Sequence, residues 1–353
     1  MTTQLIPLPD LINHYSVQHG VTPDDPRIMQ AIQQKYTLVG PGFVVPHDIL
    51  RPEGLVTHDA RHHPRHLHYR VPHTQRALAH HWSRPGSIIA EWSALALHGL
   101  HDFSTGADTT LLGAFELLLA ETHESPTLRR RRKHHTTTLL QMDGRPILVT
   151  DRMQTLAACL RSLRDKEHAW DTLASLKLDP VTVMSVQLID LFCKSFGVTH
   201  SEIRTGLAKR FSARTLEKYL ALSCPLAESR PETILRLLIN EAVADLPGVR
   251  FESQVPVYTD GTVGEPGTQD KHRTLLTRWD IAERKLMVGV QYDGEHHLQR
   301  KQRDKDAEIT ADVTSLGWGQ LRISAGMLRK TGETKQRVRS AVLHALAREQ
   351  AAS

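Results

Sequence analysis

The segment Trp279–His297, WDIAERKLMVGVQYDGEHH, carries two short apolar runs separated by a charged tripeptide. The second run, Leu286–Asp293, is predicted to form a strand. Side chains alternate between the two faces of a strand. Gln291 and Asp293 therefore share one face, and the opposite face contains Leu286, Val288, Val290 and Tyr292. The segment predicts an amphipathic strand with polar groups gathered at its end.

The charged tripeptide Glu283–Lys285 predicts a tight connection back to the strand that contains Asp280. A hairpin of this kind brings Asp280 across from Gln291 and Asp293. Mg²⁺ and Mn²⁺ prefer oxygen ligands and are commonly held by one or two carboxylates. The sequence therefore predicts a Mg²⁺ or Mn²⁺ site at this edge of a sheet.

Other motifs surround this segment at spacings that suggest a known family. They are Ser229–Arg236 at the start of a helix, the Asp280 strand, Val290–His297, a charged helix over Arg303–Val313, and Gly317–Arg322. In combination they resemble the PD-(D/E)XK, or restriction-endonuclease-like, superfamily. Within it, they resemble the DUF559 branch, which is related to very-short-patch mismatch repair endonucleases. The resemblance spans roughly Glu228–Arg348.

This resemblance implies a metal-dependent endonuclease that hydrolyses phosphodiester bonds in DNA, in DNA repair or phage defence. Asp280, Asp293 and the amide oxygen of Gln291 would bind the metal. The family more often has glutamate at the position of Gln291, which brings a negative charge that glutamine lacks. The family spacing assigns proton transfer or water orientation to His297, with His296 as the fallback.

The resemblance also assigns roles outside the two strands. Glu232 would reach the site from its helix, and Arg303 and Arg322 would bind phosphate oxygens. The alternative function is a non-catalytic, DNA-binding regulator of antitoxin type, in which the nuclease fold is kept for binding alone.

Composition limits the class of protein. The 353 residues are too many for one ordinary core and suit two or three domains. With 40% hydrophobic and 24% charged residues, no apolar run of membrane length and no signal peptide, the sequence predicts a cytoplasmic globular protein. The net charge of +5 favours a polyanionic partner such as DNA. Cys159, Cys193 and Cys224 are predicted to be buried thiols.

We predict an α/β (α+β) multidomain fold. The predicted parts are a winged-helix-like domain over residues 1–83, an antitoxin-like α/β domain over 84–180, a helical linker over 181–224, and a restriction-endonuclease-like domain over 225–353. In the first part, Tyr36–Pro46 predicts a hairpin around Gly-Pro-Gly. The last part is expected to contain a mixed sheet with helices on both sides.

Ile88–Leu100 is predicted to be a helix, with Ser87 as its N-cap and Gly99 at its end. Its sequence SALALHGL resembles a signature of abortive-infection antitoxin-like proteins, which combine a winged helix with a small α/β domain. The resemblance implies a toxin–antitoxin or defence partner. Ser93 and His98 lie five positions apart, on different helix faces, which argues against a nucleophile pair.

Two polar stretches leave alternatives open. The first is rich in histidine and contains His58, His62, His63, His66, His68, His73, His80 and His81. We interpret it as a solvated loop or edge strand, with a weak transition-metal site as the alternative. The second is the basic run Arg129, Arg130, Arg131, Arg132 and Lys133, which predicts either a phosphate-binding patch or a solvated edge.

The C-terminal pattern predicts a definite order of elements. It is helix Glu228–Ala244, a strand in Val249–Tyr258, the hairpin above, helix Arg300–Leu316, a buried strand Gln320–Ser324, and helix Ala325–Ala351. Pro256 indicates either an edge position or a strand end within Val249–Tyr258. A further helical region, Val181–Tyr219, precedes it and has a basic second half.

Overall fold

The computed structural model describes residues 4–115, 125–173, 175–294 and 300–352, without the side chains of 300–306 and 352. Helices and three sheets make up this part of the chain, which confirms the predicted α/β (α+β) class. The chain divides into two compact units. Unit 1 contains Met1–Asp171 and Ile203–Ala213, and unit 2 contains Thr172–Glu202 and Arg214–Ser353.

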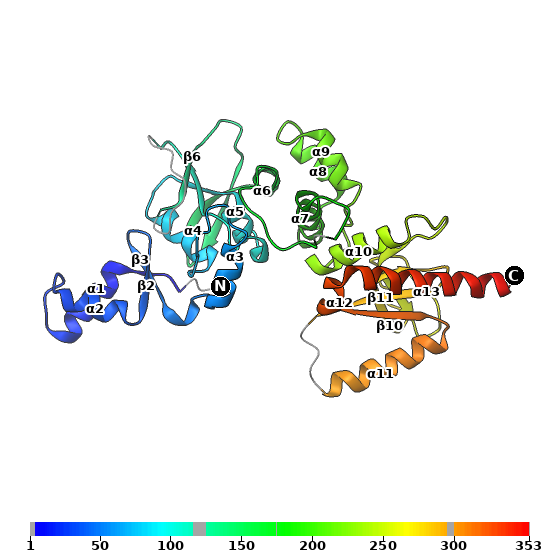
Figure 1. The fold of residues 1–353 in the computed structure, drawn as a ribbon. Helices are drawn as coiled ribbons and strands as arrows, with labels where there is room; N and C mark the ends of the chain where they lie inside the picture. Colours follow the sequence, from blue (N-terminus) through cyan, green and yellow to red (C-terminus); the bar gives the residue numbers. More distant parts are fainter. Residues whose placement is uncertain (1–3, 116–124, 174, 295–299, 353) are drawn as a thin grey trace. The chain divides into compact units, whose positions relative to one another are not determined.

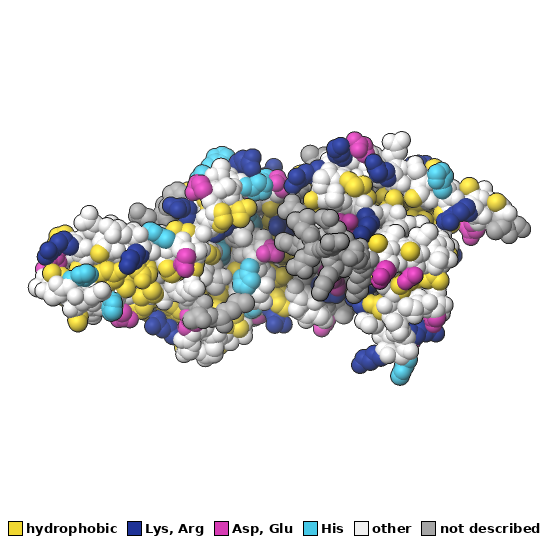
Figure 2. Space-filling view, turned by 90° about the horizontal axis from the view of Figure 1, so that it is seen from below, with side chains coloured by type: hydrophobic (Ala, Val, Ile, Leu, Met, Phe, Trp, Pro, Cys, Tyr) yellow, Lys and Arg dark blue, Asp and Glu magenta, His cyan; other side chains and the backbone are white. Residues whose placement is uncertain are grey.

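Unit 1 begins with two helices and a small antiparallel sheet (Figure 1). The elements are β1 (Ile6–Pro7), α1 (Leu8–His19), α2 (Pro26–Gln33), β2 (Tyr36–Val39) and β3 (Phe43–Pro46). The predicted hairpin is confirmed, since β2 pairs with β3 in antiparallel register. The helices pack on this sheet through a cluster of buried side chains, Leu11, Ile28, Ile32 and Val44. Hydrophobic side chains also gather on the surface of this end of the unit (Figure 2).

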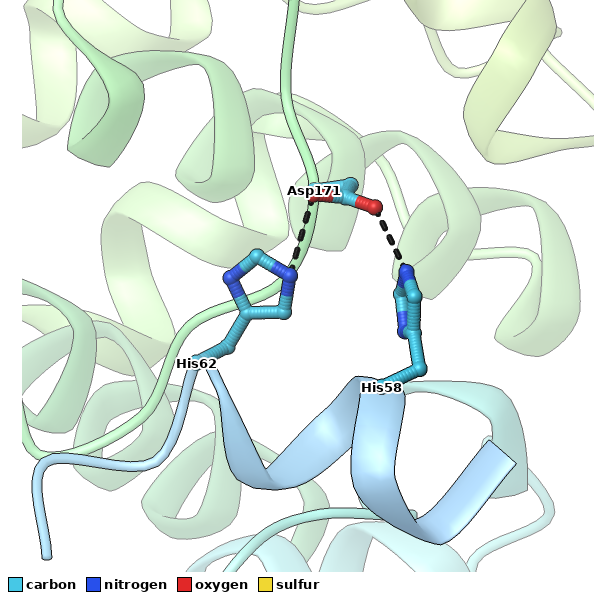
Figure 3. Close-up of side chains that lie close together, drawn as sticks. All are labelled: His58, His62 and Asp171. Atoms are coloured by element: carbon cyan, nitrogen blue, oxygen red, sulfur yellow. Dashed lines mark hydrogen bonds and ion pairs between the residues drawn. The ribbon is translucent and has the colours of Figure 1, made fainter. Parts of the chain in front are cut away.

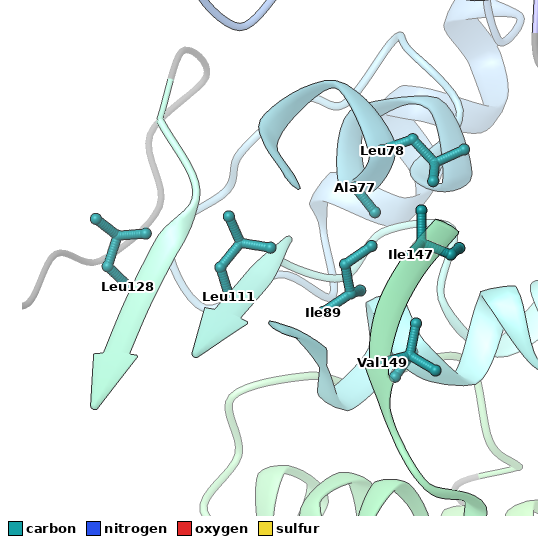
Figure 4. Packing of buried hydrophobic residues seen from close by; sticks show 8 residues of the cluster. Ala77, Leu78, Ile89, Leu111, Leu128, Ile147 and Val149 are labelled. Atoms are coloured by element: carbon teal, nitrogen blue, oxygen red, sulfur yellow. The ribbon is translucent and has the colours of Figure 1, made fainter. Parts of the chain in front are cut away.

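The larger part of unit 1 is built on a five-stranded sheet of order β6-β5-β4-β8-β7. Its strands are β4 (Ile88–Ala90), β5 (Thr110–Gly113), β6 (Thr127–Arg130), β7 (Thr137–Met142) and β8 (Arg145–Thr150). Its helices are η1 (His47–Ile49), α3 (Glu53–Ala60), α4 (His73–Trp82), α5 (Glu91–Leu97), η2 (His101–Phe103) and α6 (Arg152–Arg164). Ala77 and Leu78 of α4 pack over Ile89, Leu111 and Ile147 of the sheet (Figure 4).

Ser87 is not the N-cap that the sequence predicted. Ile88–Ala90 forms the strand β4, and α5 begins only at Glu91, after Ala90. β4 lies between β5 and β8, so its fully buried isoleucines are held by strand pairing on both sides. Short apolar runs fit a buried strand as well as a buried helix, and pairing on both edges favours the strand here.

The interpretation of the histidine-rich stretch as a solvated loop or edge strand is wrong for much of its length. Parts of it form α3 and α4, and His63, His73, His80 and His81 are buried. Hydrogen bonds compensate for this burial: His63 Nε2 lies 2.7 Å from Asp108 Oδ1, and His73 Nε2 lies 2.8 Å from Ser93 Oγ. Buried polar side chains with such hydrogen-bond partners are tolerated in a core.

Unit 2 contains a four-stranded mixed sheet of order β12-β11-β10-β9. Its strands are β9 (Glu252–Tyr258), β10 (Leu275–Glu283), β11 (Val288–Asp293) and β12 (Gly319–Ser324). Helices cover it on both sides, with α10 and α13 on one side and α11 on the other, as predicted (Figure 1). The bounds of the covering helices are α10 (Arg230–Ala242), α11 (Arg300–Ser315) and α13 (Thr331–Ala352), and the short α12 (Ala325–Arg329) precedes α13. The chain passes between the units after Asp171, within α8 (His200–Leu207) and within α9 (Ala213–Leu220); the last two follow α7 (Pro180–Phe196).

Three details of unit 2 differ from the prediction. The hairpin turn is Arg284–Met287 rather than Glu283–Lys285, because Met287 adopts a left-handed backbone conformation and delays the second strand. β12 is an edge strand, and only its Ile323 is buried, so the predicted buried strand is wrong. The closing helix is interrupted at Lys330. β9 lies at the other edge, which is one of the two predicted alternatives.

No single helix in the described ranges is both long and apolar enough to cross a membrane. The pair α7 and α8 meets that length and composition test only when taken together across a bend of 109°.

Gly289 is a position at which any side chain is expected to destabilise unit 2. A Cβ atom there would lie 2.3 Å from Cδ2 of Trp279, whose indole is fully buried. We expect Gly289→Ala to lower the free energy of unfolding by about 1–3 kcal/mol, as overpacking does in other cores. Urea unfolding measures this change. Gly332→Ala on α13 is the matched control, because its Cβ meets open space, and an equal loss in both variants would contradict the steric explanation.

Candidate active site

Four polar residues lie at neighbouring positions on the four strands of unit 2, and we call them the row. Trp279 pairs with Val255 and Ile281 with Ser253, so Asp280 and Gln254 lie between the same two pairs. Ile281 and Val290 form the last pair of β10 and β11, and Asp280 and Gln291 are the next residues of the two strands. Gln291 in turn pairs with Arg322 on β12. The row therefore contains two amides, one carboxylate and one guanidinium.

Asp280 lies where β10 and β11 stop pairing. The paired residues end at Ile281 and Val290, and beyond them the backbone N–H of Tyr292 donates a hydrogen bond of 2.7 Å to Asp280 Oδ2. Burial raises the pKa of Asp280 to about 7, although this hydrogen bond opposes the rise. The nearby negative charges of Glu232, Glu228 and Asp293 also raise the pKa.

Glu232 reaches the same region from α10. Ser229 caps that helix, and its hydroxyl donates to Glu232 Oε1 at 2.8 Å, while its Oγ accepts from the Glu232 amide at 3.3 Å. Gln254 Nε2 donates to Glu232 Oε2 at 3.1 Å and so connects the helix to the row. Burial also raises the pKa of Glu232, and these hydrogen bonds lower it in part.

Asp293 ends β11 and carries the last carboxylate of the group. Its Oδ2 lies 3.5 Å from Nε of Arg322, and both side chains are about one-third exposed. Arg322 is therefore already beside a carboxylate, as well as within reach of solvent. To bind a phosphate, the Arg322 guanidinium would have to contact the phosphate and Asp293 at the same time.

The donor set suits a hard divalent cation. Carboxylates from Asp280, Asp293 and Glu232 and the amide of Gln291 offer oxygen atoms, which Mg²⁺ and Mn²⁺ prefer. Burial is the main cause of the raised pKa of Asp280, and repulsion from the neighbouring carboxylates adds to it; a bound cation relieves this repulsion. Oxygen chemistry and local charge therefore both fit the predicted metal.

Several predicted site residues cannot be placed in this arrangement. His296 and His297 lie outside the described residues, and so does the side chain of Arg303, whose backbone belongs to α11. Sequence reasoning in turn missed Gln254 and Glu228. The pairing of β9 and the hydrogen bond to Glu232 bring Gln254 to the site, and no local motif indicates it. Glu228 directly precedes the Ser229 cap, so its position near the start of α10 was readable from the sequence.

The other candidate residues lie in unit 1. Arg129 pairs with Glu91 at 3.2 Å and with Glu167 at 3.1 Å, while Arg130, Arg131, Arg132 and Lys133 are exposed. On the face seen in Figure 2, basic and acidic side chains are interspersed. Ser93 Oγ accepts a hydrogen bond from the Thr110 amide, and His98 Nε2 lies 2.9 Å from the Thr150 carbonyl. Ser93 and His98 therefore have separate partners.

The predicted burial of the cysteines is confirmed for Cys159 and Cys193, whereas Cys224 is half-buried. All three are free thiols. Burial raises the pKa of the Cys159 and Cys193 thiols, which disfavours the reactive thiolate.

Comparison of the chain with protein-family models, curated proteins and solved structures finds no significant match. The functional assignment therefore depends on the geometry of the site.

Proposed function

We propose that unit 2 is a metal-dependent endonuclease that hydrolyses phosphodiester bonds in DNA, with Mg²⁺ or Mn²⁺ as its cofactor. The observation that carries this proposal is the environment of Asp280. Its half-buried carboxylate has a raised pKa and lies near the negative charges of Glu232 and Asp293, just beyond the last pair of β10 and β11. The element order of helix, three antiparallel strands, helix and parallel strand supports the resemblance to the PD-(D/E)XK superfamily and its DUF559 branch.

Each residue of the group has a chemical task in this proposal. Asp280 and Asp293 bind the cation, and Gln291 contributes a neutral oxygen. Glu232 holds Gln254 in place and adds negative charge beside Asp280. A bound divalent cation supplies phosphate charge neutralisation and water activation. Arg322 and Arg303 bind phosphate oxygens, and the family spacing proposes His297, or else His296, for proton transfer.

A second candidate function is a non-catalytic, DNA-binding regulator of antitoxin type. Gln291 favours it, because an amide in place of the usual glutamate lowers the negative charge available to a metal. The exposed basic residues that follow Arg129 would then bind DNA phosphates, and binding would weaken steeply with salt. DNA repair, phage defence and a toxin–antitoxin partnership are the proposed settings for one or the other function.

Gln291→Glu separates the two functions. For a nuclease, the added carboxylate should lower the Mg²⁺ concentration needed for half-maximal nicking by roughly tenfold, because a full charge adjoins the ion. Nicking of supercoiled plasmid and of a mismatched duplex, titrated with Mg²⁺ or Mn²⁺ and repeated with chelator, measures this shift.

Gln336→Glu, on the exposed surface of α13, is the matched control for added charge and should leave the titration unchanged. A regulator predicts that the native protein and both variants are inert. Identical metal titrations for active native and Gln291→Glu proteins would show that residue 291 is not a ligand.

A further inference from the structure

Three side chains of unit 1 bring two imidazoles and one carboxylate together (Figure 3). Nε2 of His58 lies 2.7 Å from Asp171 Oδ2, and Nε2 of His62 lies 3.0 Å from Asp171 Oδ1. One potential ligand atom from each residue falls within 4.8 Å of the other two. We call these three residues the His-His-Asp cluster. It contains nitrogen donors, unlike the carboxylate and amide group of unit 2.

The local fold holds the cluster in place. His58 belongs to α3, and His62 lies one turn further on, where its backbone N–H donates to the Asp59 carbonyl at 3.0 Å. The i, i+4 spacing puts both imidazoles on one side, with ring centroids 5.4 Å apart. On the other side of the cluster, Trp170 packs edge-on against Phe103 and so anchors the backbone next to Asp171.

We propose that the His-His-Asp cluster is a binding site for a divalent transition-metal ion, with Zn²⁺ as the expected occupant. Imidazole nitrogen suits Zn²⁺ and its neighbours in the first transition row, whereas Mg²⁺ requires oxygen ligands. Tetrahedral Zn²⁺ with bonds of about 2.0–2.1 Å sets its ligand atoms about 3.3 Å apart. The two imidazoles contact different oxygens of Asp171, at 2.7 and 3.0 Å, and one ligand atom from each residue lies within 4.8 Å of the others, so side-chain rotations can bring the three to this spacing.

A fourth residue orients one of the ligands. Nδ1 of His58 lies 3.4 Å from Asp59 Oδ1, on the opposite side of the ring from Asp171. Asp59 is itself paired with Arg51 and is thereby held in position. When Nε2 of His58 binds a metal, its N–H moves to Nδ1, where Asp59 can accept it. A carboxylate behind a histidine ligand is the arrangement that fixes the ring tautomer in many zinc sites.

The cluster is open on one side. The side chains of His58, His62 and Asp171 are 40%, 26% and 68% exposed. Three protein ligands with solvent access leave a coordination position for water, as in zinc sites with an exchangeable ligand. The exposure also means that a metal can enter without unfolding of the unit. Zn²⁺ would tie α3 to the segment at Asp171, and so should raise the melting temperature.

The test uses tag-free, full-length protein freed of metal with a chelator. Isothermal titration with Zn²⁺ and the visible absorption of added Co²⁺ measure affinity, stoichiometry and geometry, and Mg²⁺ serves as the oxygen-seeking comparison. We expect one tight Zn²⁺ per chain, a rise in melting temperature with Zn²⁺, and neither effect with Mg²⁺. The double variant His58→Ala/His62→Ala should bind Zn²⁺ at this site at least a hundredfold more weakly.

Two further variants make the outcome decisive. Asp171→Asn keeps the size of the exposed side chain but weakens its metal affinity, and should lower Zn²⁺ affinity at least tenfold with an unchanged circular dichroism spectrum. His14→Ala/His19→Ala removes two exposed histidines of α1 and should bind Zn²⁺ like the native protein. The proposal is overturned if the native protein binds no Zn²⁺, or if the cluster variants and the α1 control lose equal affinity. Neither result bears on nicking by unit 2.

Discussion

Asp280→Asn is expected to reduce Mg²⁺-dependent nicking by more than a hundredfold and, at pH 8, to stabilise the metal-free protein. Loss of residues that merely support a metal ligand lowers affinity or activity by roughly 10–100-fold, so loss of a ligand should exceed this. The stabilisation has a separate cause. Asparagine can still accept the Tyr292 hydrogen bond, but it carries no negative charge beside Glu232 and Asp293.

The pH dependence of this effect follows from the raised pKa of Asp280. The folded protein holds the Asp280 proton up to about pH 7, whereas the unfolded chain releases it near 3.8. The native free energy of unfolding therefore falls as pH rises between these values, and the full cost is present above pH 7. With partial exposure, Asp280→Asn should recover about 1–3 kcal/mol at pH 8 and close to none at pH 4.

Urea unfolding of metal-free protein at both pH values, with and without added Mg²⁺, measures the change. Asp312→Asn on the exposed surface of α11 is the matched control and should alter neither stability nor nicking. The assignment of Asp280 fails if its variant is less stable than the native protein at pH 8, or if it nicks DNA at the native rate.

Arg236→Met should lower the free energy of unfolding by about 3–5 kcal/mol, the usual result of leaving one partner of a buried ion pair alone. Asp190 is completely buried in α7, and Arg236 Nη2 of α10 lies 2.8 Å from its Oδ2. The Cys224 amide and the Thr233 hydroxyl also donate to this carboxylate. Burial nevertheless raises the pKa of Asp190, and Arg236 opposes that rise. Removing Arg236 leaves the charge without its cationic partner.

Chemical denaturation at pH 7 measures this loss, with two comparisons. Asp190→Asn/Arg236→Met should be less destabilised than Arg236→Met, because no buried charge is left. Arg339→Met breaks the exposed pair with Asp245 and should cost less than about 1 kcal/mol. Equal losses for Arg236→Met and Arg339→Met would mean that the buried charge is not what holds α7 to α10.

Local signals in the sequence predicted the order of the elements from α10 to the closing helix, although not their exact bounds or the burial of β12. Alternating apolar residues predicted the β10–β11 hairpin and the shared face of Gln291 and Asp293. Ser229 was placed at the start of a helix, and it caps α10 through the amide of Glu232. Gly317 ends the α11 region with a positive φ of 87°. These features depend on neighbours within a few positions, so a single segment contains the information.

Tertiary structure decided which segments far apart in the sequence pair with or bury one another. Ile88–Ala90 became a strand because β5 and β8 pair with it, and four histidines became buried because partners such as Asp108 came from far along the chain. The register of β9 added Gln254 to the candidate site.

The His-His-Asp cluster illustrates the same division. The i, i+4 spacing of His58 and His62 was visible in the sequence, but Asp171 lies 113 positions after His58. A helical pattern determines which side chains share a face, because the spacing of the backbone is regular. Which carboxylate meets that face depends on the path of the whole chain, and this path is selected by burial and pairing among segments that no local pattern connects.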